Sequence, residues 1–280
     1  MRDYPKIIEV QFSNNCNSNC LICPYKDMHY FYENMSDKLF DKLLNEIDEN
    51  KLIRIIPYLN NEPFLSPNFM DRVKKIRERF KKIEIEISSN VSMIKRKDIV
   101  DMSKLNITEL RLSVFGYDRK TYSKMMPGLN YDNTFKNLEM ISLIMKNTST
   151  KVSIVMIDNG EIAEEEFVNM NLLCKKLGFN FERWGFLDRS GNVKYKSNGI
   201  YNENVSFCEQ NRPLERMHIL ADGRVIFCCQ DWAHSLVVGD LKNNTIREIW
   251  NGEKYNMVRD SLYNKCLESP DICKKCKLGH

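Results

Sequence analysis

A strand followed by a helix recurs about six times in residues 7–184, and this repeat limits the possible folds more than any other feature of the sequence. Short apolar runs of strand length alternate with longer stretches whose apolar residues recur at helical spacing. Such a repeat predicts a parallel sheet with crossover helices. Because six units are too few for a closed eight-stranded barrel, we expect an α/β fold of the open, partial (β/α)6 barrel type.

The loops that follow the expected strands are unusual. The strands are expected at residues 7–12, 52–59, 83–87, 110–114, 152–157 and 179–184. The helices are expected at 37–47 with Ser36 as N-cap, 69–80, 99–105, 133–145 with Asp132 as N-cap, and 163–177. Loops of unusual sequence follow four of the strands, at 15–25, 60–65, 88–90 and 115–116. Ligands bind at the carboxyl ends of parallel strands, so these loops predict a site at that edge.

The pattern changes after the last repeat. A polar stretch within residues 188–206 is rich in Gly, Ser and Asn and predicts a linker. Residues 217–220 and 225–228 flank Asp222-Gly223, which predicts a β-hairpin. Short helices are expected at 246–250 and 255–262. We therefore expect three regions: a partial-barrel domain at 1–187, a linker at 188–206 and a small α+β domain at 207–280.

Composition narrows the class of protein. Lys and Arg number 42 against 38 Asp and Glu, a near balance that argues against nucleic acid or an anionic membrane as the main partner. The N-terminus lacks the apolar region of a signal peptide, and no apolar run approaches the ~20 residues that span a bilayer. We expect a cytoplasmic protein, in which thiols stay reduced. Ten cysteines in such a protein indicate metal binding.

Three of the cysteines form a compact group. Cys16, Cys20 and Cys23 have the spacing C-x3-C-x2-C, and no Cys or His follows within ligand reach. A structural zinc site needs four protein ligands, and a cubane iron–sulfur cluster is normally held by four thiolates. Three thiolates would leave one iron open to another ligand. A zinc knuckle or three buried thiols are the alternatives.

This loop, placed after the first strand, resembles the signature of the radical S-adenosylmethionine (SAM) superfamily. The resemblance implies a [4Fe–4S] cluster on the three cysteines, with the methionine end of SAM on the open iron. One electron from the cluster would cleave SAM to methionine and a 5′-deoxyadenosyl radical, which removes a hydrogen atom from the substrate. It also implies an electron donor of the flavodoxin or ferredoxin type.

The resemblance extends to residues that would bind SAM. Asn60-Asn61-Glu62-Pro63 stands where the family has a Gly-Gly-Glu-Pro segment, and asparagine tolerates the positive φ that such a turn needs. Ser89-Asn90 resembles a Thr-Asn-Gly segment, with Val91 in place of the glycine. The remaining candidates are Ser113 for the ribose and carboxylate, Lys124 or alternatively Arg119 for the carboxylate, and Tyr25 for the adenine.

A second cysteine group resembles the twitch/SPASM auxiliary-cluster domain. Its order is C…G-x4-C…C-x2-C, and its ligands would be Cys208, Cys228, Cys273 and Cys276. Four thiolates would saturate a second [4Fe–4S] cluster, although Cys229 could replace Cys228 and a zinc ribbon remains an alternative. Cys229 or Cys266 could deliver a hydrogen atom, whereas Cys174 is expected in the core.

Residues near this second group suggest a substrate site. Arg189 resembles an arginine that lies near substrate in a twitch-domain aminocyclitol dehydrogenase, and Asp231 and His234 are expected to face a cavity. The resemblance implies oxidation of a sugar or aminocyclitol alcohol by a radical SAM oxidoreductase. An epimerase or a peptide maturase would use the same hydrogen abstraction. A zinc-stabilised binding module is the alternative that is not an enzyme.

Overall fold

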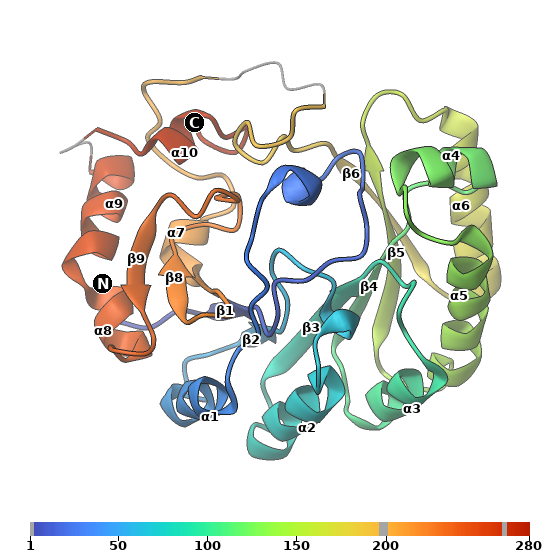
Figure 1. Cartoon of the computed structure of the whole chain (residues 1–280), viewed down its shortest axis with the longest axis horizontal. Helices are drawn as coiled ribbons and strands as arrows, with labels where there is room; N and C mark the ends of the chain where they lie inside the picture. Colours follow the sequence, from blue (N-terminus) through green and yellow to red (C-terminus); the bar gives the residue numbers. More distant parts are fainter. Residues whose placement is uncertain (1–2, 196–200, 265–267) are drawn as a thin grey trace. The chain divides into compact units, whose positions relative to one another are not determined.

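The computed structural model describes residues 3–195, 201–264 and 268–280 (Figure 1). The chain forms two compact units, neither of which is continuous in sequence. Unit 1 consists of Met1–Asn14, Asp27–Asn61 and Leu187–His280. Unit 2 consists of Asn15–Lys26 and Glu62–Phe186.

Unit 2 is built on four parallel strands in the order β3-β4-β5-β6. Their bounds are β3 Glu84–Ser89, β4 Glu109–Ser113, β5 Lys151–Asp158 and β6 Asn180–Gly185. The apolar run in β5 is almost entirely buried, as expected for a strand covered on both faces. The parallel strand–helix repeat predicted from the sequence is confirmed in this unit.

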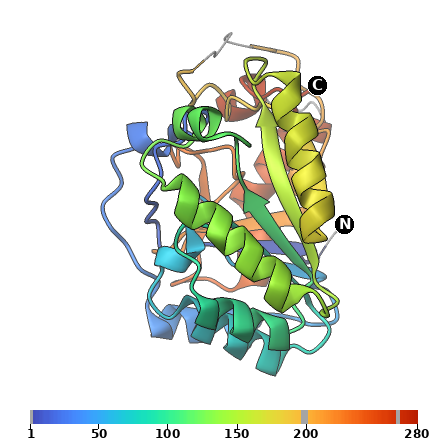
Figure 2. The ribbon, with the colours of Figure 1, turned by 90° about the vertical axis from the view of Figure 1, so that its right-hand side faces the viewer.

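One helix precedes β3, and helices follow each of these strands except the last. Their bounds are α2 Phe69–Arg79, α3 Arg96–Lys104, α4 Arg119–Met125, α5 Tyr131–Met145 and α6 Glu164–Leu177, with a short 3-10 turn η2 at Pro63–Leu65. Helices α3, α5 and α6 lie next to one another as a layer on the sheet (Figure 2). Each buries one apolar stripe, such as Leu138, Ile141 and Met145 of α5.

The described part of unit 1 has five strands in the order β2-β1-β7-β8-β9. Their bounds are β1 Ile7–Val10, β2 Arg54–Ile56, β7 Arg216–Ile219, β8 Arg224–Ile226 and β9 Val237–Asp240. Strands β2, β1 and β7 are parallel, whereas β8 and β9 are antiparallel to their neighbours. The predicted hairpin is confirmed, and Gly223 turns it with φ +92°.

Short helices complete unit 1. They are α1 Asp37–Glu46, α7 Arg212–Glu215, α8 Ile246–Asn251, α9 Glu253–Tyr263 and α10 Asp271–Lys274, and a 3-10 turn η1 covers Pro24–Asp27 at the boundary of the two units. Trp250, Tyr255 and Phe227 are fully buried between α8, α9 and the hairpin. The Arg259 guanidinium stacks 4.0 Å from the ring centres of Trp250 and of Tyr255.

Several local features differ from the sequence prediction. The N-cap of α5 is Asn130, whose side chain accepts from the Asn133 amide at 2.9 Å, and Asp132 instead pairs with Arg119. Helix α4 and strand β9 were not predicted, because both are shorter than the windows in which periodicity is clear. No helix in the described ranges is long and apolar enough to cross a membrane.

Candidate functional site

The cysteine loop of unit 2 is held by backbone hydrogen bonds. The amide of Asn19 donates to the carbonyl of Pro127 at 3.1 Å, and the amide of Leu21 donates to that of Met125 at 2.9 Å. The amide of Cys16 donates to the Tyr25 hydroxyl at 2.9 Å. These bonds anchor the loop to the residues at the end of α4. The Tyr25 hydroxyl therefore supports the loop backbone itself.

Without a metal ion, the thiols of Cys16 and Cys20 in this loop ionise poorly. Burial raises the pKa of Cys16 to about 12, and burial also raises the pKa of Cys20. The Ser18 hydroxyl lies 2.8 Å from the Cys20 sulfur. A thiolate binds metal and a thiol does not, so a cation must compensate the buried charge before the sulfurs of Cys16 and Cys20 ionise. The donor set therefore fits a thiolate-held iron–sulfur cluster.

Glu62 connects this loop to the end of β3. Its carboxylate is 2% exposed and accepts hydrogen bonds from the Ser89 hydroxyl at 2.8 Å, the Asn90 amide at 2.7 Å and the Phe64 amide at 3.2 Å. The Glu62 amide donates to the carbonyl of Asn15 at 2.9 Å. Burial raises the pKa of Glu62 to about 7, against these hydrogen bonds, which lower it.

Two residues that the sequence did not single out complete the link. The Asn90 side-chain amide donates to Asn17 Oδ1 at 2.9 Å. The Asn17 side-chain amide donates to the Ser92 hydroxyl at 3.0 Å, and that hydroxyl donates to Asn90 Oδ1 at 2.6 Å. This closed ring of three side chains joins the C-x3-C segment to the loop after β3. Only the position of Asn17 between two cysteines could have suggested its role.

The remaining predicted SAM residues are less closely linked. Lys124 pairs with Glu161 at 3.1 Å on an exposed surface, and its competitor Arg119 pairs with Asp132. Ser113 ends β4 half-buried and takes no part in the hydrogen bonds described above, and Pro63 begins η2. Asn60 and Asn61 belong to unit 1, where Asn61 Oδ1 accepts from the Leu59 amide at 3.0 Å.

Three cysteines of the second group gather in unit 1. Burial raises the pKa of Cys273 and of Cys276, and the neighbouring Cys208 raises both further. Cys208 forms an isolated antiparallel bridge with Gly279, which brings the two ends of this region together. The Cys276 amide donates to the carbonyl of Cys273 at 3.1 Å. Cys273 and Cys276, like Cys16 and Cys20 of unit 2, need a cation to ionise, which fits a second metal centre.

Cys228 and Cys229 adjoin a buried polar group. Glu9 and His218 are paired across β1 and β7, and the Cys229 sulfur lies with one atom of each inside a group 4.8 Å across. Burial lowers the pKa of His218, but Glu9 and Cys229 outweigh it and raise the pKa to about 9. The hydrogen bond from Cys228 is the largest cause of the lowered pKa of Cys229. The opposite pKa shifts of His218 and Cys229 follow from the short distance between the imidazole ring and the Cys229 sulfur.

The other residues that the sequence singled out near the second cysteine group have different surroundings. With its side-chain oxygen turned to two arginines, Gln230 accepts from Arg189 at 3.0 Å and from Arg212 at 2.7 Å. His234 lines a cavity, whereas Asp231 is buried and accepts from the amides of Ser235 and Leu236. Cys266 lies outside the described residues. Cys174 is a buried core thiol of α6, and burial raises its pKa to about 12.

The fold and the two cysteine groups define the class. The chain belongs to the radical SAM superfamily, whose family model matches residues 10–170, more than half of the chain. A second model, the SPASM iron–sulfur cluster-binding domain, matches residues 208–277. The chain is thus a radical SAM enzyme with a SPASM-type domain, and these domains imply SAM, a [4Fe–4S] cluster and an auxiliary iron–sulfur centre.

Individual relatives are distant. YydG of Bacillus subtilis (strain 168), whose name refers to peptide biosynthesis, is 24% identical over 156 residues, which are 54% of this chain and 49% of YydG. The match thus spans about half the length of that relative. BtrN in complex with AdoMet and 2-DOIA superposes with a TM-score of 0.66 at 17% identity, over 99% of this chain and 94% of BtrN.

Streptococcus suis SuiB bound to the precursor peptide SuiA gives a TM-score of 0.77 at 15% identity, over 99% of this chain and 70% of SuiB. At these identities the likeness concerns the fold. It confirms the predicted fold class, a partial barrel with a mostly parallel open sheet and a C-terminal antiparallel hairpin region.

Proposed function

We propose that this enzyme holds SAM at the cluster bound by Cys16, Cys20 and Cys23 and removes a hydrogen atom from a peptide substrate. The observation that carries the SAM site is the hydrogen-bonded connection from Glu62 through Asn90 to Asn17. It joins the cysteine loop to two segments that resemble SAM-binding segments of the family. A polar network whose groups are paired with one another holds its members in fixed positions, which suits a binding site.

Each residue then has a defined task. The thiolates of Cys16, Cys20 and Cys23 would hold the cluster, and an iron without a protein ligand would be available to SAM. SAM at a reduced [4Fe–4S] cluster supplies a hydrogen-atom acceptor, with methionine and 5′-deoxyadenosine as the final products. Glu62 offers a carboxylate for the SAM amino group, and Asn90 and Ser89 fix its orientation. A flavodoxin- or ferredoxin-type protein would supply the electron.

Two comparisons support a peptide as the substrate class. The name of YydG refers to peptide biosynthesis, and SuiB binds the precursor peptide SuiA. A peptide substrate leaves the outcome open between oxidation and epimerisation. In an epimerisation a thiol returns a hydrogen atom to the substrate radical and is left as a thiyl radical, and Cys229 is a candidate for this thiol because it adjoins the second cysteine group.

Dehydrogenation of a sugar or aminocyclitol alcohol is the second candidate. It is favoured by the nearly complete overlap with BtrN, which covers 99% of this chain and 94% of BtrN. It is also favoured by the position of Arg189, whose guanidinium lies beside Gln230 and Arg212 near the second cysteine group. The auxiliary cluster would then accept the second electron of the oxidation.

The SAM site is tested by cleavage in the absence of substrate. The chain is reconstituted anaerobically with iron and sulfide, reduced with dithionite and incubated with SAM, and 5′-deoxyadenosine is measured by mass spectrometry. Cys20→Ala should abolish the product. Cys174→Ala, which removes a buried thiol in α6, should retain it. Persistent cleavage by Cys20→Ala would contradict the assignment of the cluster, and a reconstituted chain that binds only zinc would contradict the enzyme.

The substrate class is tested with peptides encoded by neighbouring genes and with a panel of aminocyclitols, in deuterated water. An oxidised product is two mass units lighter and carries no solvent deuterium. An epimerised product is an isomer with one deuterium. Modification of an aminocyclitol and of no peptide would replace the first candidate by the second.

A further inference from the structure

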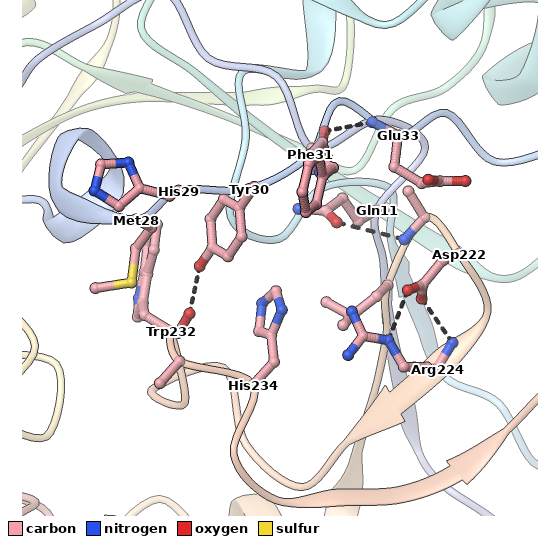
Figure 3. A pocket seen from close by; sticks show the side chains of 14 residues that line it. Gln11, Met28, His29, Tyr30, Phe31, Glu33, Asp222, Arg224, Trp232 and His234 are labelled. Carbon is pink, nitrogen blue, oxygen red and sulfur yellow. Dashed lines mark hydrogen bonds and ion pairs between the residues drawn. The ribbon is translucent and has the colours of Figure 1, made fainter.

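Unit 1 contains a cavity of about 450 Å³ whose walls include none of the proposed cluster or SAM ligands (Figure 3). Four segments line it. They are the residues after β1, residues 28–33, the β7–β8 turn at 220–224 and the loop at 232–234. All four belong to unit 1, and two of them continue from the carboxyl ends of the parallel strands β1 and β7.

Gln11 provides an unpaired hydrogen-bond donor in the wall. Its side chain is 1% exposed, and its Oε1 accepts from the Ala221 amide at 3.4 Å. Its Nε2 has no partner among the described residues. Figure 3 shows the Gln11 amide among the lining side chains, above His234 and beside Phe31. A buried amide hydrogen without an acceptor is unfavourable, so this position favours a ligand that brings a carbonyl or another acceptor.

Tyr30 and His234 form a rigid aromatic wall. Their rings stack with centroids 4.9 Å apart and an angle of 11°, and the Tyr30 hydroxyl donates to the carbonyl of Trp232. His234 has a left-handed backbone with φ 51°, which costs free energy in a residue with a side chain. The buried Asp231 carboxylate holds this loop by accepting from the Leu236 amide at 2.7 Å. The wall is therefore formed before any ligand arrives.

Phe31 adds an apolar surface at the opening. Its side chain is 94% exposed although its backbone is fixed. The Asn14 side chain donates to the Phe31 carbonyl at 2.6 Å and accepts from the Glu33 amide at 2.9 Å. A large ring held in water beside a cavity is unfavourable in isolation and favours a contact with an apolar ligand group.

The charges at the cavity are compensated or screened. Asp222 is paired with Arg224, whose Nε donates to it at 2.6 Å. The exposed Glu33 lies at the rim, where water screens its charge. An aminocyclitol carries ammonium and hydroxyl donors and would need an accessible carboxylate inside the cavity. The paired Asp222 does not provide one.

We propose that this cavity binds an uncharged segment of the peptide substrate, with one peptide carbonyl on Gln11 Nε2 and an apolar side chain against Tyr30, His234 and Phe31. This inference deepens the proposed function and rests on its assignment of a peptide substrate. The unpaired donor, the aromatic wall and the exposed ring all favour a ligand that is apolar and rich in acceptors. A peptide has both properties.

The test uses the reconstituted full-length chain and two probes, the blocked tripeptide N-acetyl-Ala-Phe-Ala-amide and a diaminocyclitol. Affinities are measured by saturation-transfer NMR titration. The tripeptide should bind, and Gln11→Glu should weaken it about tenfold because the variant keeps an acceptor for Ala221 but loses the donor. Phe31→Ala should weaken it about fivefold. Leu143→Ala, an exposed position on α5, should bind as the wild type does.

If the buried glutamate of Gln11→Glu prevents folding, as iron content and melting temperature would reveal, Gln11→Met takes its place as the variant that lacks the donor. The proposal is wrong if the tripeptide does not bind the wild type, if both Gln11 variants bind it equally well, or if the diaminocyclitol binds in its place. These outcomes are separate from the proposed function. Loss of SAM cleavage in the wild type would contradict the SAM site, and it would leave the tripeptide affinities as an independent measurement.

Discussion

Val91 has a backbone conformation that β-branched residues rarely adopt, with φ 70°. Its amide donates to the Ser89 hydroxyl at 3.0 Å, and its carbonyl accepts from the Asn137 side chain at 2.9 Å. Its side chain is fully buried. The family segment that this loop resembles has glycine here. This chain keeps the turn by fixing both peptide groups and by burying the valine methyl groups.

At Val91 a strained backbone is offset by a buried side chain, and this leads to a prediction about two truncations of that side chain. Val91→Ala should lower stability by about 2 kcal/mol, because buried methyl groups are lost and the strain remains. Val91→Gly loses slightly more contact but releases strain of about 1–2 kcal/mol, and its stability should lie within about 1 kcal/mol of wild type. The measurement is the melting temperature of the anaerobic protein. A glycine variant that melts below the alanine variant would show that Val91 is unstrained.

The sequence predicted single residues of the site where a local pattern defined them. The cysteine spacing and the Glu-Pro pair were visible because each is contiguous in sequence. The Asn17–Asn90–Ser92 ring was not, because it needs segments about 70 residues apart to meet. Cys228 and Cys229 could not be distinguished, since the difference between them is the contact of one sulfur with His218 from another strand.

At the scale of elements, the short helix α4 supports the cysteine loop. The carbonyls of Met125 and Pro127, at and beyond its end, accept the hydrogen bonds of the cysteine loop. Gly116 permits this arrangement, because a Cβ there would lie 2.3 Å from the Tyr122 backbone nitrogen. Seven residues make a marginal helix in isolation, so α4 depends on packing that no local pattern records. That explains why it was not predicted.

Gly116→Ala should therefore displace α4 and loosen the cysteine loop. We expect a melting temperature at least 5 °C lower, because the clash involves backbone atoms that cannot rotate away, and reduced retention of iron at the first cluster. Gly185→Ala is the matched control, since a Cβ at that strand position meets no atom within 4 Å. Equal iron retention in the two variants would show that α4 does not position the loop.

At the scale of the whole molecule, the two cysteine groups belong to different units. Cys16, Cys20 and Cys23 lie in unit 2, whereas Cys208, Cys228, Cys273 and Cys276 lie in unit 1. The sequence predicted the parallel repeat and the hairpin, because each depends on neighbouring residues. It could not predict that residues 27–61 pack in one unit with residues 187–280, because such packing depends on surfaces far apart in the chain.

Because the two cysteine groups lie in different units, a substitution in one group should remove the iron of that group only. The wild type should bind about eight irons after anaerobic reconstitution, four at each group. Cys20→Ala should bind about four and lose SAM cleavage. Cys276→Ala should also bind about four, but it should keep the spectrum of the first cluster. Retention of about eight irons by Cys276→Ala would contradict an auxiliary cluster at this group.

The choice between the adjacent thiols follows from the same measurement. Cys228 has the spacing from Gly223 that the auxiliary-domain pattern requires, whereas the Cys229 sulfur lies beside Glu9 and His218. Cys228→Ser should therefore reduce the iron content to about four, whereas Cys229→Ser should retain about eight. Iron analysis and electron paramagnetic resonance of the reduced proteins distinguish these results. The reverse pattern would make Cys229 the ligand and would leave the Glu9–His218 pair to orient an iron-bound sulfur.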